Sequence, residues 1–376
     1  MGLTPFHELK ADLVSLQSLA RLRSLRARSG IDFASNDYLA LASAPRLLDT
    51  VRRSIERGVP LGSGGSRLLR GNDPEHEALE AEAAAFFGSE AALYFSTGYA
   101  ANAALFSTLP QRGDLVVHDS LVHASAHEGM RLGRATAMVA PHNDAQRFED
   151  AIVAWRTAGG TGRPWIAVES LYSMDGDRAP LGDLAIIAAR HEAVLLIDEA
   201  HATGVFGSQG RGLAADLEGQ DNVITLRTCG KALGCEGALV CGPRIVCDFL
   251  INRGRGFIFS TAPSPLMASA VRESLRVLAD EPERRARLHA LIAGAERILA
   301  PLGVVATGSQ ILPLVLGDDA HTMQIAEALQ NAGFDVRGIR PPTVPAGTSR
   351  LRFSLTLNAT IQDVEFLADA LGNVLR

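Results

Sequence analysis

Lys231 is a candidate catalytic residue because of the sequence on either side of it. It lies in the segment Thr228-Cys229-Gly230-Lys231, between two apolar runs at residues 223–226 and 238–241. This pattern predicts a strand, a tight loop and a second strand. A charged, unpaired lysine between buried strands is costly, so burial should depress its pKa. An amine of lowered pKa can form Schiff bases with carbonyl compounds.

A surface lysine beside a turn would have the same local sequence, and Asp198 favours the chemical interpretation. Five apolar residues, 193–197, precede Asp198 and predict a buried strand that ends in a carboxylate. Open α/β sheets bind their ligands at that end of the strands, and a buried carboxylate needs a cationic partner. Pyridoxal phosphate (PLP) needs at least an amine to hold its aldehyde and a carboxylate to keep its pyridine nitrogen protonated. Lys231 and Asp198 could supply these two groups.

The elements that must position these residues alternate between strand and helix from residue 91 to residue 241. This alternation predicts a mainly parallel sheet with helices on both faces. After Arg253 the pattern changes to longer helices and fewer strands, which indicates a smaller α/β domain. We expect an N-terminal helix and arm at residues 1–40, a large domain at 41–255 and a small domain at 256–376. Within the arm, residues 8–28 form a helix candidate.

The composition fits a soluble globular enzyme of two domains. The chain has 376 residues, with 47% hydrophobic and 21% charged residues. Its formal net charge of −6 argues against general nucleic-acid binding. The N-terminus lacks a signal pattern and no apolar run approaches the length of a membrane span, so the expected location is the cytoplasm.

Two groups of residues raise the question of a metal, and neither has the spacing of a metal site. The four cysteines lie evenly six residues apart, from Cys229 to Cys247, and we expect reduced structural thiols. Of His118, His123 and His127, the last two could share a helix face, but no third ligand has a suitable spacing, so no metal site is predicted.

A small-residue turn at Ser96-Thr97-Gly98-Tyr99 follows the predicted strand 91–95 and opens a helix. The first N–H groups of a helix have no intrahelical partner and lie at its positive end, so they can bind an anion. Every strand-to-helix turn shares this feature. Because Lys231 and Asp198 imply PLP, we assign Gly98 and Tyr99 to the cofactor phosphate.

Eight motifs in order resemble the α-oxoamine synthases, a family of fold-type I PLP enzymes. They run from about Phe33 to the C-terminus and read SNDYLAL, GSGGSRLLRGN, STGYAANAAL, SLVHAS, SLYSMDGD, IDEAHATGVFG, TCGKALG and RPPTVPAGTSRLRFSLTL. The resemblance implies an aspartate-aminotransferase-like α/β fold, with a mainly parallel seven-stranded sheet in the large domain and a smaller C-terminal α/β domain. It also implies a homodimer with active sites at the interface.

The resemblance implies further contacts to the cofactor. His123 would stack on the PLP ring and could move protons near neutral pH. Ser173 and His201 would lie near the phenolic oxygen, with Thr228 also at the cofactor. Thr261 would reach the phosphate bound by the partner subunit.

The resemblance also implies contacts to the substrates. Arg350 and Arg352 alternate with apolar residues, so on a strand both side chains share one face. That face is either an exposed edge or an inner face on which an arginine binds a carboxylate. The carboxylate-binding arginine of the family falls at Arg352, and Asn36 and Thr343 also match substrate residues. The arginines of residues 21–28 form either a solvated face or an acyl-chain or CoA contact, for which we choose Arg21.

The expected reaction is a decarboxylative condensation. Lys231 would act as general base on an amino acid whose carboxylate is held by Arg352, and the product would form with loss of CO2 and the thiol. Thr203 and the block at residues 340–352 favour the branch that uses L-alanine and a pimeloyl thioester of CoA or of an acyl-carrier protein, in biotin biosynthesis.

Other functions stay open. Glycine C-acetyltransferase, 5-aminolevulinate synthase and serine palmitoyltransferase share most of these motifs, and a plain aminotransferase would release no CoA. A binding module without catalysis would not need both Lys231 and Asp198. A dinucleotide-binding dehydrogenase would need a GxGxxG motif at the start of a βαβ unit. No βαβ unit predicted in this sequence has that motif.

Overall fold

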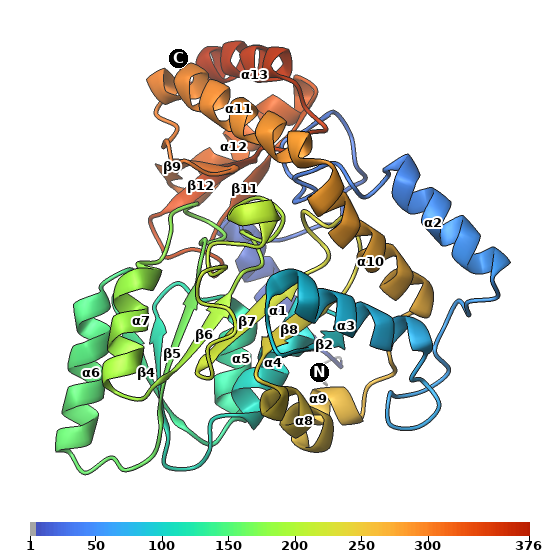
Figure 1. Cartoon of the computed structure of the whole chain (residues 1–376). Coiled ribbons are helices and arrows are strands. Elements are labelled where there is room, and N and C mark those ends of the chain that lie inside the picture. Colours follow the sequence, from blue (N-terminus) through green and yellow to red (C-terminus); the bar gives the residue numbers. More distant parts are fainter. Residues whose placement is uncertain (1–4) are drawn as a thin grey trace. The chain divides into compact units, whose positions relative to one another are not determined.

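The computed structural model describes residues 5–376, which divide into two compact units (Figure 1). The large unit comprises Leu39–Ser173 and Asp177–Arg285. The small unit comprises the residues up to Tyr38, Met174–Gly176 and Ala286–Arg376. No helix within residues 5–376 is long and apolar enough to cross a membrane.

The large unit is built on a seven-stranded sheet with the strand order β2-β8-β7-β6-β5-β3-β4. The strands β4, β3, β5, β6 and β7 are parallel to one another, whereas β8 runs antiparallel to both of its neighbours, β7 and β2. The predicted, mainly parallel seven-stranded sheet is therefore confirmed. The strands are β2 (Ala91–Phe95), β3 (Leu115–Asp119), β4 (Thr136–Ala140), β5 (Pro164–Glu169), β6 (Val194–Asp198), β7 (Val223–Thr228) and β8 (Ala238–Gly242).

Helices cover both faces of this sheet, because its central strands are apolar on both sides. Along β3, Val116 packs in one core cluster with α4, α5 and α8, and its neighbours Leu115 and Val117 pack in a second cluster with α6 and α7. The helices are α2 (Pro45–Glu56), α3 (Pro74–Phe87), α4 (Gly98–Thr108), α5 (Ala124–Leu132), α6 (Ala145–Thr157), α7 (Leu181–Arg190), α8 (Arg244–Arg253), α9 (Arg255–Ile258) and α10 (Pro265–Asp280).

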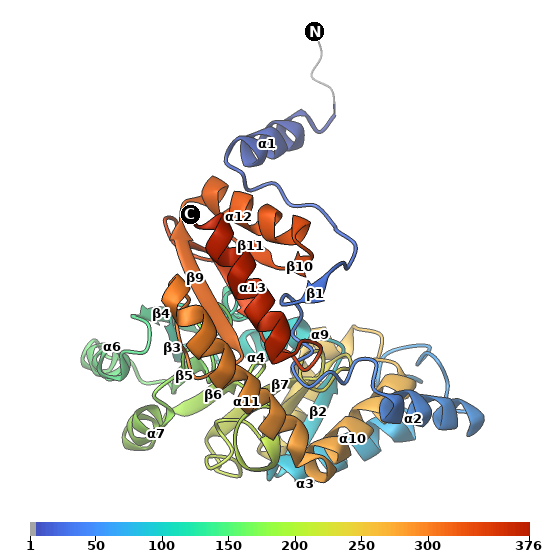
Figure 2. The ribbon, with the colours of Figure 1, turned by 90° about the horizontal axis from the view of Figure 1, so that it is seen from above.

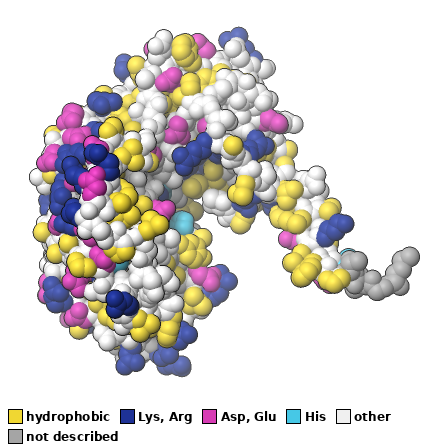
Figure 3. Space-filling model, turned by 90° about the vertical axis from the view of Figure 1, so that its right-hand side faces the viewer, with side chains coloured by type: hydrophobic (Ala, Val, Ile, Leu, Met, Phe, Trp, Pro, Cys, Tyr) yellow, Lys and Arg dark blue, Asp and Glu magenta, His cyan; other side chains and the backbone are white. Residues whose placement is uncertain are grey.

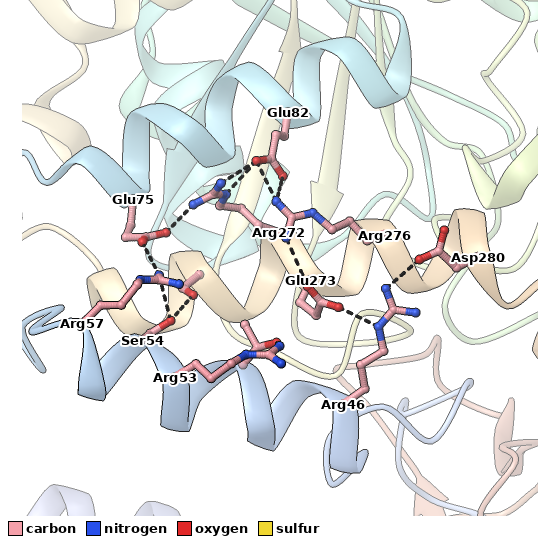
Figure 4. Close-up of polar contacts among 12 residues, drawn as sticks. Arg46, Arg53, Ser54, Arg57, Glu75, Glu82, Arg272, Glu273, Arg276 and Asp280 are labelled. Atoms are coloured by element: carbon pink, nitrogen blue, oxygen red, sulfur yellow. Dashed lines mark hydrogen bonds and ion pairs between the residues drawn. The ribbon is translucent and has the colours of Figure 1, made fainter.

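A layer of ion pairs joins α2, α10 and α3 (Figure 4). Arg46 on α2 contacts Glu273 and Asp280 on α10, each at 2.6 Å. Arg272, on the same helix α10, contacts Glu82 on α3 at 2.6 Å. Because α10 is held between two helices of the large unit, this unit extends to Arg285, rather than to residue 255 as the sequence suggested.

The small unit contains a three-stranded antiparallel sheet with the order β11-β12-β9 and a two-stranded parallel pair, β1-β10. The pairing of β1 with β10 joins the N-terminal arm to this unit. Its elements are α1 (His7–Ser18), β1 (Ile31–Asp32), α11 (Pro282–Leu299), β9 (Ile311–Gly317), α12 (Asp319–Asn331), β10 (Phe334–Asp335), β11 (Arg337–Ile339), β12 (Ser349–Ser354) and α13 (Ile361–Val374). Figure 2 shows α11 and α13 side by side, and a Cβ added at Gly294 of α11 would lie 2.6 Å from Ile361 of α13.

The predicted helix over residues 8–28 is too long, because α1 ends at Ser18. Ala20 adopts a left-handed conformation with φ 55°, and the Arg21 N–H donates to the Leu16 carbonyl at 2.8 Å. This hydrogen bond closes the helix end in the manner of a C-terminal cap. Residues 21–29 then continue without regular structure.

Candidate active site

The carboxylates of Asp198 and Glu169 lie at the edge of the large sheet where parallel strands end. Asp198 ends β6 and pairs in register with Glu169, which ends β5. Both Asp198 oxygens are held: the Ala200 N–H donates to Oδ1 at 2.9 Å, and Asn102 Nδ2 donates to Oδ2 at 2.8 Å. The carboxylate therefore has a fixed direction at the edge where this type of sheet binds ligands.

Lys231 lies in the loop between β7 and β8, as predicted. Its Nζ donates to Thr228 Oγ1 at 3.4 Å, and the Thr228 hydroxyl donates to the Ala200 carbonyl at 3.3 Å. The loop is compact because Gly234 and Gly237 have positive φ, and a Cβ at Gly237 would lie 2.4 Å from the Tyr94 ring. Lys231 is half-buried, so this loop holds its amine near the ends of β6 and β7.

His123 lies close to both charged residues. It caps the N-terminus of α5, where its Nδ1 accepts from the Ser125 N–H at 3.2 Å. The residue is exposed, yet the protein around the imidazole desolvates it enough to lower its pKa; the charge of Asp198 acts in the opposite direction, and that of Lys231 lowers the pKa further. The structure thus brings Lys231, Asp198 and His123 together.

Glu169 is a buried acid that the sequence did not single out. Burial, and next the negative charge of Asp198, raise the pKa of its carboxyl well above the ordinary value. Its Oε2 accepts from the Ser173 N–H at 3.2 Å, which places Ser173 beside this carboxyl group. Burial therefore favours the neutral form of this second carboxyl group.

The segment predicted to bind the cofactor phosphate lies at the N-terminus of α4. Thr97 caps the helix by accepting from the Ala100 N–H at 3.0 Å. A Cβ added at Gly98 would lie 2.6 Å from Thr228 Cγ2, so glycine lets the helix approach the end of β7. Tyr99 is half exposed, and its ring lies edge-on to His123 with 6.4 Å between centroids. An anion bound here would meet N–H groups and the positive end of the helix.

His201 and Thr261 occupy different parts of the large unit. His201 is buried in the loop that follows β6. Thr261 is exposed and lines a small pocket of about 10 Å³ with Arg67 and Ser96, just before Gly98.

The residues of the large unit fit PLP. They supply an amine, a fixed carboxylate, a flat imidazole and a helix N-terminus as binding groups. The helix N-terminus has no room for a Cβ at Gly98. Across residues 5–376, no group of three or more His, Cys, Asp or Glu side chains could hold a metal ion.

Arg352 and Asn36 lie together in the small unit. Arg352 Nη2 donates to Asn36 Oδ1 at 2.9 Å and to the Tyr38 hydroxyl at 3.4 Å. Arg350, on the same strand β12, instead forms an ion pair with Asp175. Among residues 5–376 no carboxylate pairs with Arg352, and its Nε is buried without a hydrogen-bond partner. Arg352 is therefore the arginine of this pair that can still bind a carboxylate.

The structure does not bring Arg21 to Thr343. Arg21 forms an ion pair with Asp319 at 2.6 Å, whereas Arg23 Nη2 lies 3.4 Å from Thr343 Oγ1. Arg23 and Thr343 line a pocket of about 250 Å³ in the small unit, together with Arg26, Arg337 and Arg340. The sequence favoured Arg21 without a firm basis, because several arginines follow one another and nothing local distinguishes them.

Comparisons with known proteins identify the family of this chain. A model of the family described as "Aminotransferase class I and II" matches residues 28–371. The chain belongs to the aminotransferase class I and II family. The family prediction and the PLP cofactor are thereby confirmed, as is the fold-type I architecture.

Curated and solved relatives narrow the family. An 8-amino-7-oxononanoate synthase of Anaeromyxobacter dehalogenans is 43% identical over 93% of this chain and 87% of its own length. A solved 8-amino-7-oxononanoate synthase of Francisella tularensis has a TM-score of 0.79 and 28% identity, and the match covers 92% of this chain and 98% of that one. A serine palmitoyltransferase variant of S. paucimobilis with bound PLP has a TM-score of 0.87 and 26% identity, over 99% of this chain and 98% of that one. The relatives named 8-amino-7-oxononanoate synthase confirm the assignment to that kind of enzyme, which catalyses a step of biotin biosynthesis.

Proposed function

We propose that this PLP-dependent enzyme condenses L-alanine with a pimeloyl thioester of CoA or of a carrier protein. The products are 8-amino-7-oxononanoate, CO2 and the free thiol, a step of biotin biosynthesis. The observation that carries the proposal is the meeting of Lys231, Asp198 and His123 at one edge of the sheet, in a chain 43% identical to a named 8-amino-7-oxononanoate synthase.

The residues of the large unit have distinct roles in this proposal. When bound, PLP supplies an aldehyde that condenses with amines and a pyridinium that withdraws electrons from Cα. Lys231 would hold the aldehyde group and, once the substrate amine has displaced it, its freed Nζ would serve as the general base for the Cα proton. Asp198 would keep the pyridine nitrogen protonated, and His123 would supply the flat imidazole against the ring. The N–H groups of Gly98 and Tyr99 bind the phosphate, and Ser173, His201 and Thr228 contact the remaining polar atoms.

The residues of the small unit bind the substrates. Arg352 receives the carboxylate of alanine, because its guanidinium is buried and has no acidic partner among residues 5–376. Asn36 orients that guanidinium through the hydrogen bond at 2.9 Å. Thr343 and Arg23, which replaces Arg21 in this role, contact the acyl substrate in the arginine-lined pocket.

A homodimer completes the site in this proposal. The large unit exposes several large apolar side chains, and such side chains mark an interaction surface where they form a contiguous patch. Figure 3 shows apolar patches among mixed charges on the face that carries α2 and α10. Thr261 would contact the phosphate bound in the partner subunit. The exposed side chains are Leu48, Ile55, Leu61, Leu69, Tyr99 and Phe259.

The decisive experiment follows thiol release and the PLP absorbance of the purified chain. Alanine, glycine and serine are each paired with pimeloyl-, acetyl-, succinyl- and palmitoyl-CoA. We expect turnover with alanine and pimeloyl-CoA, and a product with the mass of 8-amino-7-oxononanoate. Turnover only with glycine would assign the chain to a sister condensing enzyme. An absorbance band that no amino acid alters would overturn the catalytic role of Lys231.

Serine palmitoyltransferase is the second candidate, because solved structures of that class also match this fold over nearly the whole chain. The match to the enzyme of Sphingomonas wittichii has a TM-score of 0.88, against 0.79 for the 8-amino-7-oxononanoate synthase of Francisella tularensis. Turnover of serine with palmitoyl-CoA in the same assay would favour it.

A further inference from the structure

Asn102 is a buried polar residue that connects Asp198 with His123. It lies on α4 and is 2% exposed. Its Nδ2 lies 2.8 Å from Asp198 Oδ2 and 3.0 Å from Ser125 Oγ. Ser125, which is 1% exposed, brings its Oγ to 2.7 Å from His123 Nδ1. A continuous chain of hydrogen bonds therefore runs from the end of β6, through α4, to the start of α5.

The direction of each hydrogen bond in this chain follows from the Asp198 carboxylate. An ionised carboxylate only accepts, so the amide nitrogen of Asn102, rather than its oxygen, faces Asp198. The second hydrogen of that nitrogen goes to Ser125 Oγ. The hydroxyl hydrogen of Ser125 is then left to donate to His123 Nδ1.

The backbone imposes the same direction on His123. The Ser125 N–H donates to His123 Nδ1 at 3.2 Å, and an N–H group cannot accept in return. Nδ1 therefore carries the lone pair, and the proton of the neutral ring lies on Nε2. The partner of one ring nitrogen commonly fixes the form of the other in this way.

We propose that Asn102 is a positioning residue that, through Ser125, fixes the Asp198 carboxylate and holds His123 in the Nε2–H form. The hydrogen-bond chain belongs to the protein alone, whereas its use in catalysis rests on the proposed function. Asp198 thus keeps a constant direction toward the pyridine nitrogen, and His123 presents an N–H at Nε2.

The test reads the protonated nitrogen of His123 directly. The full chain is labelled with 15N-histidine, and long-range 1H–15N spectra are recorded with PLP bound and after its removal. The signals of His123 are those that a His123→Gln variant lacks. We expect the Nε2–H form in both states of the wild type.

Two variants separate the two effects of Asn102. Asn102→Leu removes the hydrogen bond to Asp198, so PLP affinity should fall about tenfold, as expected for one hydrogen bond to a charged group. The same change frees the Ser125 hydroxyl to accept from Nδ1–H instead. Because the remaining backbone contact to Nδ1 is the longer of the two, 3.2 Å against 2.7 Å, the His123 signals should move toward a mixture of the two neutral forms. Ser125→Ala should move these signals while lowering PLP affinity less. Ser107→Ala, on the same helix α4, is the matched control and should change neither.

Two results would overturn the proposal. One is an Nδ1–H form of His123 in the wild type. The other is a folded Asn102→Leu variant with unchanged His123 signals and unchanged PLP affinity; where this variant does not fold, unchanged signals in Ser125→Ala would overturn the proposal equally. Because no substrate is needed, a chain that releases no thiol would refute the proposed function without altering this outcome.

Discussion

At the scale of single residues, two arginines on one strand differ in what they can bind. Arg350 is paired with Asp175, whereas Arg352 donates hydrogen bonds to the uncharged groups of Asn36 and Tyr38 in the small unit. A buried guanidinium with uncharged partners retains most of its capacity for a carboxylate. This difference is the basis for proposing Arg352, rather than Arg350, as the arginine that binds the amino acid.

Arg352→Met should raise the KM for alanine about 10- to 100-fold, the range expected for charge-assisted hydrogen bonds. The PLP absorbance of the resting enzyme should stay unchanged, since Arg352 belongs to the small unit and Lys231 to the large unit. Steady-state kinetics over a range of alanine concentrations measures the effect, with Arg297→Met on the exposed side of α11 as the control. A KM within twofold of the wild type would remove Arg352 from the substrate site.

Sequence alone identified the residues whose chemistry is unusual in their local setting. Lys231 and Asp198 stand at the ends of apolar strands, where charged groups are costly, so their position is informative. Asn102 was missed because its partner Asp198 is 96 residues away, and no local pattern shows which buried amide faces a carboxylate. Arg23 was missed for the same reason: its contact with Thr343 spans 320 residues.

At the scale of elements, a histidine holds the loop after β5 in place. His142 follows β4, and its two ring nitrogens lie 2.9 Å from Asp119 Oδ1 and 2.7 Å from Asp177 Oδ2. Burial lowers the pKa of His142, but the hydrogen bonds to both carboxylates outweigh burial and raise the pKa to about 10. Asp177 also stabilises this loop through its backbone, because its carbonyl accepts from the Tyr172 N–H at 2.9 Å.

This ion pair predicts a pH dependence of stability with a definite sign. The pKa of His142 rises from 6.5 to about 10 on folding, so its stabilisation is complete below pH 6.5 and is lost as the pH rises through about 10. His142→Gln should lower the Tm by about 2–4 °C at pH 7, after allowance for solvent screening, and by much less at pH 10.5. Thermal unfolding at both pH values measures this, with His321→Gln at an exposed site as the control. An equal loss at both pH values would contradict the role of the charge.

The approach of α4 to β7 predicts a second effect at this scale. In Gly98→Ala the new Cβ would lie 2.6 Å from Thr228 Cγ2, so the helix N-terminus must move away from the strand end. PLP affinity should fall at least about tenfold, because the phosphate would lose aligned N–H groups. Gly182→Ala is the control, since no atom lies within 4 Å of a Cβ at that position of α7. Titration of each apoprotein with PLP gives the affinities, and equal values would argue against the phosphate at Gly98.

The strands of the large unit were predictable because each is a short apolar run between small or polar residues. The run at 193–197 became β6, and the runs around Lys231 became β7 and β8. The helix at residues 8–28 was overextended, since its repeating leucines give no sign of the left-handed turn at Ala20. Its apolar side chains Leu9 and Leu13 are exposed in the structure, so periodicity reflected no buried face.

At the scale of the whole molecule, the sequence predicted two units but placed the border too early. Residues 256–285 change in pattern from the preceding strands and helices, and this change predicts that the small domain starts there. The ion pairs of α10 with α2 and α3 assign the segment to the large unit instead. Such pairs join residues far apart in the chain, so a composition shift cannot reveal them.

The proposed dimer makes a prediction that neither unit could satisfy alone. If Thr261 serves the partner's site, then mixing two weak variants should restore activity. A Lys231→Ala chain lacks the amine but still offers Thr261, and a Thr261→Val chain lacks the hydroxyl but keeps Lys231. After unfolding and refolding together, a heterodimer carries one site with both residues, so thiol release should exceed the sum of the separate variants.

The controls for this mixing experiment fix its meaning. Analytical ultracentrifugation should give twice the mass of 39.8 kDa for the wild type and for each variant. PLP affinity, measured by titration, should be weaker in Thr261→Val than in the wild type, because the phosphate would lose one hydroxyl donor. A Lys231→Ala chain mixed with a Lys231→Ala, Thr261→Val chain should stay inactive, as no pairing contains the amine. If the first mixture shows only the summed activity while the dimer mass is found, Thr261 acts within its own chain, and the exposed apolar side chains alone support the interface.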